Sequence, residues 1–231
     1  MAKFNTNSNT YIIIYSVVMV VVVAVLLSVA SLSLQSRQYE NMLNEKKDQI
    51  VKALGENPAE TPYDSIIAEA VVFDAEGNVL TNDAAEVFEV MKDLKGAFEQ
   101  GKYPAFKAAT GVVLPLYGAG LWGPIWGYIG FGKDHNTIQA VCFGHKGETP
   151  GLGAKIADEP WFAESFVGKK VGYGDVLFEI VKPGNSTNPK SSVDAISGAT
   201  ITSQALGNTL NQWFGFYKSY LDKNIPSVVE E

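Results

Sequence analysis

One long uncharged segment near the N-terminus limits what this chain of 231 residues can fold into. From Phe4 to Ser36 there is no charged side chain, and Tyr11–Ala30 consists almost entirely of apolar residues, chiefly valine and isoleucine. Twenty residues of α-helix extend for about 30 Å, which matches the hydrocarbon core of a bilayer. The segment therefore predicts a transmembrane helix at residues 11–34, after a short N-terminal segment at residues 1–10.

A cleaved signal peptide is the alternative interpretation of this segment, because Ser28–Ala30 resembles a small-x-small cleavage site. We favour an uncleaved anchor, since the apolar run is longer than a normal signal-peptide core and only Lys3 precedes it. The charge pattern leaves the orientation open. Several basic residues follow the span, yet long domains cross membranes largely regardless of charge.

The remaining residues are numerous enough for one domain with a substantial core. We place a juxtamembrane helix and linker at residues 35–62 and the domain at residues 63–231. The formal net charge of −7 argues against a nucleic-acid partner, because phosphate binding needs clustered Lys and Arg. Cys142 is the only cysteine, which excludes an intrachain disulfide and a four-thiolate iron–sulfur centre. Without a second long apolar run, residues from about Thr61 onward are expected to form a soluble domain.

Hydrophobic patterns in the second part of the chain alternate between the periods of strands and helices. Ile66–Val72 and Val79–Leu80 flank the turn residues Asp74–Asn78, which predicts a β-hairpin. Apolar residues at helical spacing predict one helix over Asp83–Glu99. Further strands are predicted at Val112–Tyr117, Ile125–Phe131, Thr137–Phe143 and Val176–Val181. This order predicts an α+β fold with a mainly antiparallel sheet flanked by helices.

Two features that suggest binding sites lack the surroundings that such sites need. Gly118–Gly123 matches the G-x-G-x-x-G dinucleotide fingerprint, which requires a helix directly after it. Pro124 and a strand-like segment follow instead, so no helix N-terminus can receive a pyrophosphate. His135 and His145 lack the spacing and neighbours of a metal site. The sequence therefore predicts neither a nicotinamide site nor a metal centre.

The strongest functional motif is the segment Asp194–Ser203, which places hydroxyl residues on both sides of Gly198 and Ala199. Apolar residues at helical spacing follow it and predict an amphipathic helix: Leu206, Leu210, Trp213, Tyr217 and Leu221. Small residues let a ligand approach the backbone, and the N–H groups and dipole of a helix start favour an anion. The motif indicates a phosphate site, with an ordinary Ser/Thr helix cap as the alternative.

A second loop, Gly144–Gly153, combines several glycines with a proline and an acidic residue. Such a loop is rigid, and its backbone can lie against a flat ring system. Taken alone it is typical of an ordinary turn. Together with the hydroxyl motif it suggests a site for a cofactor that has both a phosphate and a ring.

Both motifs resemble signatures of the bacterial FMN-binding domain family. Asp-x-x-Ser-Gly-Ala-Thr at residues 194–200 is similar to the motif on which flavin transferases esterify FMN to a threonine. Glu-Thr-Pro-Gly-Leu-Gly at residues 148–153 is similar to the second signature of that family. The resemblance implies a flavin-binding core at about residues 110–215.

Several further segments resemble the C-subunit family of the Na⁺-translocating NADH:quinone reductases (NQR). They are Tyr117–Trp122, Trp126–Tyr128, and Trp161 followed by Gly168–Lys170. With the N-terminal anchor included, this resemblance covers most of the chain. The match is weakest in Gln38–Tyr103.

The resemblance also implies roles for particular residues. It implies covalent attachment of FMN at Thr200 and recognition by the transferase at Asp194, for which a structural role in a turn is the alternative. The residues implied to line the phosphate are Ser197, Gly198, Ala199 and Thr202, with Thr202 or Ser203 capping the helix. The residues implied to contact the flavin are Glu148, Thr149, Leu152 and Gly153. Trp122 and Trp126 are further candidates for neighbours of the ring, although we favour packing in the core as the role of each.

As a function, the resemblance implies an electron carrier without catalytic acid or base residues of its own. Its implied partners are the other NQR subunits, especially the B-subunit and the iron–sulfur-bearing membrane subunits, and a flavin transferase during maturation. The implied location is the bacterial inner membrane, crossed once, with the short N-terminus at residues 1–10 in the cytoplasm and the domain on the periplasmic side. Two alternatives remain, the flavoprotein subunit of the Rnf-type ferredoxin:NAD⁺ oxidoreductase and a non-redox, membrane-anchored binding module.

Overall fold

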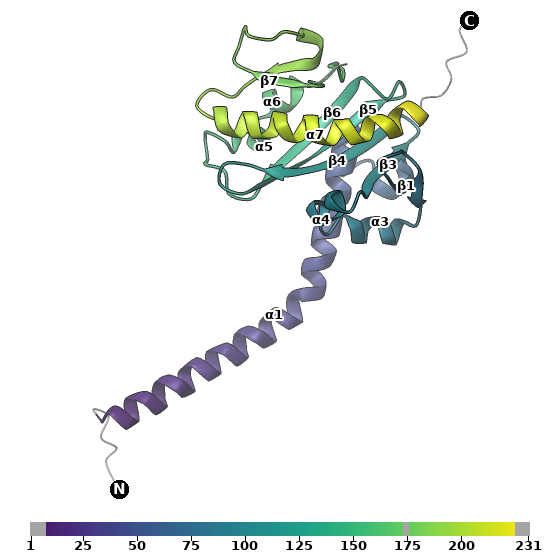
Figure 1. Cartoon of the computed structure of the whole chain (residues 1–231). Coiled ribbons are helices and arrows are strands. Elements are labelled where there is room, and N and C mark those ends of the chain that lie inside the picture. The colour runs from purple at the N-terminus through teal and green to yellow at the C-terminus, as the bar shows by residue number, and fades with distance from the viewer. Residues whose placement is uncertain (1–7, 173–175, 225–231) are drawn as a thin grey trace, which may run out of the picture. The chain divides into compact units, whose positions relative to one another are not determined.

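The computed structural model describes residues 8–172 and 176–224, and it divides into two compact units at residues 45 and 46. The helices, most of them labelled in Figure 1, are α1 (Asn9–Ala53), α2 (Tyr63–Ile66), α3 (Ala84–Val90), α4 (Leu94–Glu99), α5 (Lys155–Asp158), α6 (Pro160–Glu164) and α7 (Thr200–Asn224), with a 3₁₀ turn at Pro189–Ser191. The strands are β1 (Ile67–Phe73), β2 (Val79–Thr81), β3 (Tyr103–Ala108), β4 (Gly111–Ala119), β5 (Pro124–Gly132), β6 (Ile138–His145), β7 (Glu179–Val181) and β8 (Ser192–Asp194).

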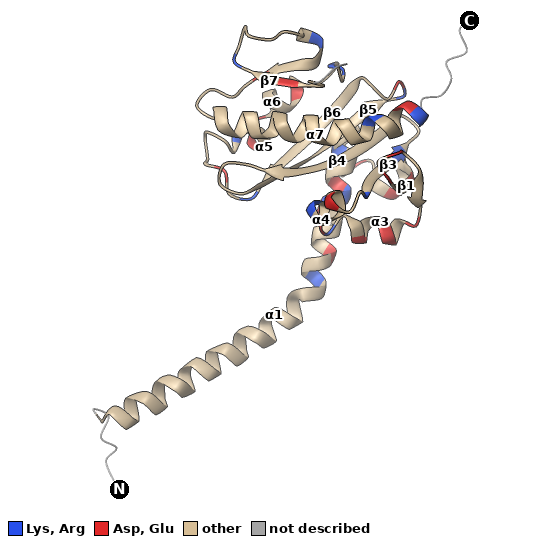
Figure 2. Ribbon diagram, in the orientation of Figure 1, with Lys and Arg blue, Asp and Glu red and all other residues tan. Residues whose placement is uncertain are grey.

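The first unit contains the apolar part of α1. Every residue from Asn9 to Met42 is exposed, and the first charged residue of α1 is Arg37. The ribbon of α1 in Figure 2 is accordingly tan over most of its length. By length and composition, α1 is the one helix in the described part of the chain that could cross a membrane. A helix that exposes apolar residues on all sides is stable only in an apolar environment. The expected N-terminal apolar helix is therefore confirmed.

The last turns of α1 belong to the second unit and form part of its core. Ile50, Val51 and Ala53 are fully buried. A Cβ atom added at Gly130 in β5 would lie 1.8 Å from the carbonyl oxygen of Ala53, so the end of the helix lies directly on the sheet. The sequence assigned this part of the chain to a juxtamembrane helix outside the domain, because charged residues surround the few apolar ones. The apolar residues nevertheless fall on one side of the helix and pack against the domain.

Two lysines fasten this end of α1 to neighbouring segments. Lys46 Nζ donates a hydrogen bond to the carbonyl oxygen of Met91, at the end of α3. Burial lowers the pKa of Lys46, and the nearby Lys92 ammonium lowers it further. Lys47 lies over the ring of Tyr63 and forms an ion pair with Asp64 at 3.2 Å. The compact unit therefore begins at Lys46, before the segment that the sequence assigned to a linker.

The domain is built on a six-stranded sheet with the order β2-β1-β3-β4-β5-β6. All neighbouring strands in it are antiparallel, which confirms the predicted α+β fold and its first hairpin. Figure 1 shows α7 lying across one face of this sheet, where it packs chiefly on β4. A separate parallel pair, β7 and β8, precedes α7 in the chain. Leu206, Leu210 and Trp213 of α7 are buried, as their helical spacing predicted.

The prediction of a single helix over Asp83–Glu99 was wrong. The segment forms two helices, α3 and α4, because Asp93 caps a new helix start: its Oδ1 accepts a hydrogen bond from Gly96 N–H at 3.0 Å. The pattern of apolar residues continues across the break and therefore hides it. Strand β3 was not predicted. Its first four residues are all buried, so its sequence lacks the alternation of apolar and polar residues that indicates a strand.

The burial of Ile50 and Val51 predicts where the domain can be separated from its anchor. A buried aliphatic side chain contributes about 1.5–3 kcal/mol to the free energy of folding. A chain that begins at Lys46 should therefore unfold at a clearly higher urea concentration than one that begins at Thr61, measured by circular dichroism. Ile50→Asp in the longer chain should abolish this advantage. Equal unfolding midpoints for the two chains would contradict the role given to this part of α1.

Candidate functional site

The two sequence motifs meet at one cavity of about 460 Å³. Three segments line it: Leu121 and Trp122 from the turn between β4 and β5, residues of the loop Glu148–Gly153, and Gly198–Thr202 at the start of α7. Sites for small molecules commonly have volumes of roughly 300–1,000 Å³. The fold therefore brings residues that lie up to about 80 positions apart in the sequence into one site of suitable size.

The carboxylate of Glu148 holds these three segments together. Its Oε1 accepts a hydrogen bond from Trp122 N–H at 2.9 Å, and its Oε2 accepts one from Thr202 Oγ1 at 2.6 Å. The side chain is 4% exposed, so an unpaired charge would be costly here. Both oxygens are satisfied by protein atoms instead. Glu148 thus lines the cavity and also fixes the positions of the turn and the helix on either side of it.

Glycines of the two motifs make this arrangement possible. A Cβ atom added at Gly153 would lie 2.5 Å from Glu148 Oε2 and 2.6 Å from Thr202 Oγ1, so a side chain there would displace their hydrogen bond. Gly198 has a φ of +80°, in the left-handed region that favours glycine, and it turns the chain into α7. Gly153 is therefore required by the close packing of two side chains, and Gly198 is favoured by its backbone conformation.

The start of α7 presents Thr200 at the cavity. Thr200 and Ile201 are exposed, and the first N–H groups of a helix have no partner within the helix. These groups and the helix dipole give this end a partial positive charge. Thr200 therefore places its hydroxyl beside the backbone donors that an anion prefers.

Thr202 and Ser203 lie inside the first turn of α7, so neither is the helix cap that the sequence suggested. Thr202 is 1% exposed, and its hydroxyl is bonded to Glu148. Ser203 is fully buried, and its Oγ accepts a hydrogen bond from Ile196 N–H at 3.1 Å. The two hydroxyls fasten the helix start to the loop before it and to the second motif.

Only some of the other residues expected at the site line the cavity. Thr149 and Leu152 line the cavity, whereas Asp194, at the exposed end of β8, and Ser197, just before Gly198, are not among its lining residues. Trp122 lines the cavity and is 68% exposed. The ring of Trp126 packs over Gly144 in the sheet and does not line the cavity.

Sequence reasoning missed two apolar residues at this site, Leu121 and Ile201. Both line the cavity and are largely exposed, as is Leu152. Local patterns could not reveal them, because the sequence does not show which apolar side chains remain outside the core. Together with Trp122 they give the cavity an apolar rim.

Comparisons with known proteins agree with this geometry. Residues 120–215 match the family of FMN-binding domains, and this range contains the whole cavity. The solved structure of the C-subunit of the Na⁺-translocating NADH-quinone reductase from Parabacteroides distasonis is 38% identical, with a TM-score of 0.73, and the match covers 81% of this chain and 96% of that one. The chain belongs to the C-subunit family of the Na⁺-translocating NADH-quinone reductases.

Curated members of the C-subunit family support the same assignment. The protein from Neisseria meningitidis serogroup A is 28% identical over 250 residues, which covers 96% of each chain. The protein from Haemophilus ducreyi is 43% identical over 108 residues, covering 46% of this chain and 41% of the relative. These matches confirm the predicted family and an FMN-binding domain. They favour the NQR family over the Rnf-type alternative and over the non-redox module.

The double hydrogen bond of Glu148 predicts a difference between two substitutions. Glu148→Gln keeps an acceptor for Trp122 N–H and can donate to Thr202 Oγ1, so it should change the free energy of unfolding by less than about 1 kcal/mol. Glu148→Ala leaves both partners unpaired and should cost about 1–3 kcal/mol. Urea unfolding of the full chain in detergent, followed by circular dichroism, measures the difference.

The control for this comparison is Glu164→Ala, at an exposed position on α6. It should leave the unfolding midpoint close to that of the unsubstituted chain. If Glu148→Ala were no more destabilising than Glu164→Ala, the carboxylate would not hold the site together.

Proposed function

We propose that this chain carries FMN as a phosphoester of Thr200 and transfers electrons within a Na⁺-translocating NADH-quinone reductase. The observation that carries the proposal is the position of Thr200. Its hydroxyl is the exposed one at the start of α7, it follows Ser-Gly-Ala, and it lies at a cavity shared with the Glu-Thr-Pro-Gly-Leu-Gly loop. The membership of the C-subunit family and the match to FMN-binding domains support the same cofactor.

The residues present fit FMN at both of its ends. The start of α7 offers backbone N–H donors for a phosphate, with Gly198 and Ala199 small enough to allow close approach. Leu121, Trp122 and Leu152 supply apolar and aromatic surface for a flat ring. Both oxygens of Glu148 accept hydrogen bonds from protein groups, which direct the carboxylate toward the turn and toward Thr202.

Burial distinguishes the two threonines of the motif as attachment points. A transferase must reach the hydroxyl that it modifies, and Thr200 is exposed whereas Thr202 is 1% exposed and bonded to Glu148. In the proposed step a bond forms between Thr200 Oγ1 and the phosphorus of FMN, and the hydroxyl proton is lost. With FAD as the donor, the bond that breaks is the pyrophosphate bond, and AMP leaves. The two threonines therefore have separate roles, attachment for Thr200 and support for Thr202.

The chain's own residues have a binding role in this function. Bound FMN supplies the electron transfer, so the protein needs no general acid or base. Trp122, Leu121 and Leu152 leave the rim of the site exposed, which suits a cofactor that must exchange electrons with partner proteins. The proposed partners are the B-subunit and the iron–sulfur-bearing membrane subunits of the complex.

We further propose that residues 11–34 anchor the chain in the bacterial inner membrane and that the domain lies on the periplasmic side. The apolar part of α1 supports the anchor. An ester bond has a physical advantage in that location, because a cofactor that dissociated would be diluted, whereas a tethered one stays at high effective concentration. Asp194, exposed at the end of β8, is proposed to be read by the transferase before the ester forms.

Two valine substitutions test the attachment site. Thr200→Val removes the hydroxyl that forms the ester and should abolish flavin fluorescence in a denaturing gel, when the chain is made with the transferase and exported. Thr202→Val is the matched control, because it removes the other threonine hydroxyl of the motif. It should retain the fluorescence but lose about 1–3 kcal/mol of stability, since it leaves Glu148 Oε2 unpaired. Fluorescence that persisted in Thr200→Val, or disappeared only in Thr202→Val, would contradict Thr200 as the attachment site.

The failed dinucleotide fingerprint predicts how the isolated protein responds to reductants. Gly118–Gly123 forms the end of β4 and the turn into β5, with no helix after it. The flavinylated chain should therefore be bleached by dithionite but not by NADH alone, as followed by flavin absorbance. Rapid bleaching by NADH would show that the chain is closer to a complete reductase than to a carrier.

A further inference from the structure

The outer side of α6 carries large apolar side chains that the core does not use. On its inner side, Phe162 and Phe166 are fully buried and contact the ring of Phe143 in β6, with centroids 6.1 and 5.2 Å away. On the outer side, Trp161 is 46% exposed, and Val167, in the turn that follows the helix, is 54% exposed. A helix that packs on a core normally has polar residues on its outer side. The packing of α6 therefore does not explain these two exposed residues.

The exposed positions of this segment have the spacing of one helical face. Ser165 N–H donates a hydrogen bond to the carbonyl oxygen of Trp161 at 3.0 Å, and Val167 N–H donates one to that of Glu164 at 3.1 Å, so helical turns continue beyond α6. Exposed residues stand at positions 160, 161, 164 and 167. Residues three and four positions apart lie on the same side of a helix. We call this surface the α6 face: Pro160, Trp161, Glu164 and Val167.

The surroundings of the α6 face are acidic. Residues 157–168 include Asp158, Glu159 and Glu164 but no lysine or arginine. None of these three carboxylates forms an ion pair with another residue in the described part of the chain. Negative charges beside exposed apolar side chains favour a partner with lysine or arginine at its surface. A second copy of this chain, with its net charge of −7, and a surface of anionic lipids both have the wrong sign.

The α6 face follows directly from the wall of the candidate flavin cavity. Leu152 lines that cavity and is 44% exposed, and its carbonyl oxygen accepts a hydrogen bond at 3.1 Å from Lys155 N–H at the start of α5. Helix α5 leads into α6, and the two helices contact each other (Figure 1).

The length of this connection limits the distance between the α6 face and the flavin cavity. Trp161 is nine positions after Leu152, so the two Cα atoms are no more than about 30 Å apart. The helical turns of α5 shorten this distance, because a helix rises only about 1.5 Å per residue. A standard interface covers about 800 Å² on each partner, which is a patch roughly 30 Å across. One partner can therefore cover Trp161 and the rim of the cavity together.

We propose that the α6 face is the docking surface for the protein partner that exchanges electrons with the flavin, and that this partner presents lysine or arginine side chains around an apolar pocket. The inference rests on the proposed electron-carrier function. The indole of Trp161 enters the pocket, since buried tryptophans are among the residues that contribute most to protein interfaces. Asp158 and Glu164 orient the approaching partner, because complementary charges steer the encounter of two proteins.

Turnover of the assembled NADH-quinone reductase complex tests the proposal, with the flavin of this chain measured separately by its fluorescence in a denaturing gel. Trp161→Ala removes the anchor and should lower the rate of NADH oxidation by quinone at least ~tenfold. Glu164→Lys reverses a charge and should lower the rate most at low salt, where charges are least screened. The matched controls are Leu80→Ala in β2, at the opposite edge of the sheet from β6, and Glu86→Lys on α3. Both controls should leave turnover unchanged.

The gel fluorescence separates a fault in docking from a fault in flavin attachment. Trp161→Ala should keep the full fluorescence of the unsubstituted chain. Lost fluorescence in this variant would overturn the proposal, because the α6 face would then serve the flavin transferase. Unchanged turnover in Trp161→Ala, or an equal loss in Glu164→Lys and Glu86→Lys, would overturn it as well.

Photo-crosslinking in the same complex identifies what covers the α6 face. The aromatic photo-crosslinker p-benzoylphenylalanine takes the place of Trp161 and, as the control, of Leu80, since both side chains are about half exposed. On illumination, position 161 should join the chain to another subunit of the complex at a segment that contains lysine or arginine, and position 80 should not. An adduct to a second copy of this chain or to lipid, equal yields at the two positions, or no adduct at position 161 would overturn the proposal.

Discussion

The buried carboxylate of Glu148 is the interaction on which the candidate flavin site depends. It accepts one hydrogen bond from the turn between β4 and β5 and another from the first turn of α7, so it joins one end of these two strands to the helix that covers the sheet. Removing one partner of a buried charge costs more than one hydrogen bond, because the charge is left without compensation. The positions of Trp122, Thr202 and the start of α7 are therefore linked, and the cavity between them is formed before a cofactor arrives.

Much of the fold follows from local patterns, and its exceptions have identifiable causes. The hairpin of β1 and β2 and the buried face of α7 were predicted because alternation and helical spacing are local signals. The break between α3 and α4 was not, since α3 ends at Val90 and the cap at Asp93 begins α4 without interrupting the apolar spacing. Ile50 and Val51 are buried against a sheet whose strands come much later in the sequence. The charged residues around them therefore suggested a helix outside the domain.

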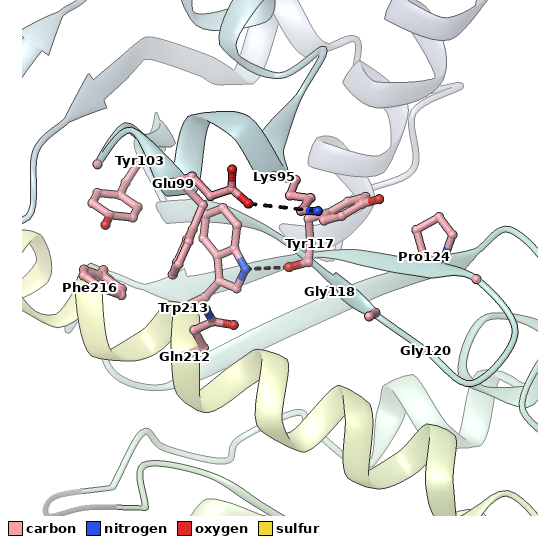
Figure 3. Close-up of a pocket in the computed structure, with 14 residues that line it drawn as sticks. Lys95, Glu99, Tyr103, Tyr117, Gly118, Gly120, Pro124, Gln212, Trp213 and Phe216 are labelled. Carbon is pink, nitrogen blue, oxygen red and sulfur yellow. Dashed lines mark hydrogen bonds and ion pairs between the residues drawn. The ribbon is translucent and has the colours of Figure 1, made fainter.

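The sequence identified the segments of the candidate site but not how they bond to each other. Thr200 and Thr202 are chemically identical, and only their different burial in the fold separates an accessible hydroxyl from one bonded to Glu148. The rim residues Leu121 and Ile201 were missed because exposure is a property of the tertiary structure. A second cavity of about 810 Å³, the aromatic cavity shown in Figure 3, could not be predicted either, since its rings come from α4, β3, β4 and α7 and share no local motif.

A crystal structure of the full chain carrying its flavin is the most direct measurement of the central claim, that Thr200 and the cavity held by Glu148 form the cofactor site. The account predicts electron density that continues from Thr200 Oγ1 into a phosphate at the start of α7, with the ring between Trp122 and Leu152. It also predicts that both hydrogen bonds of Glu148 remain in place. Density joined to Thr202, or a flavin ring lying beside Trp213 in the aromatic cavity, would contradict the account.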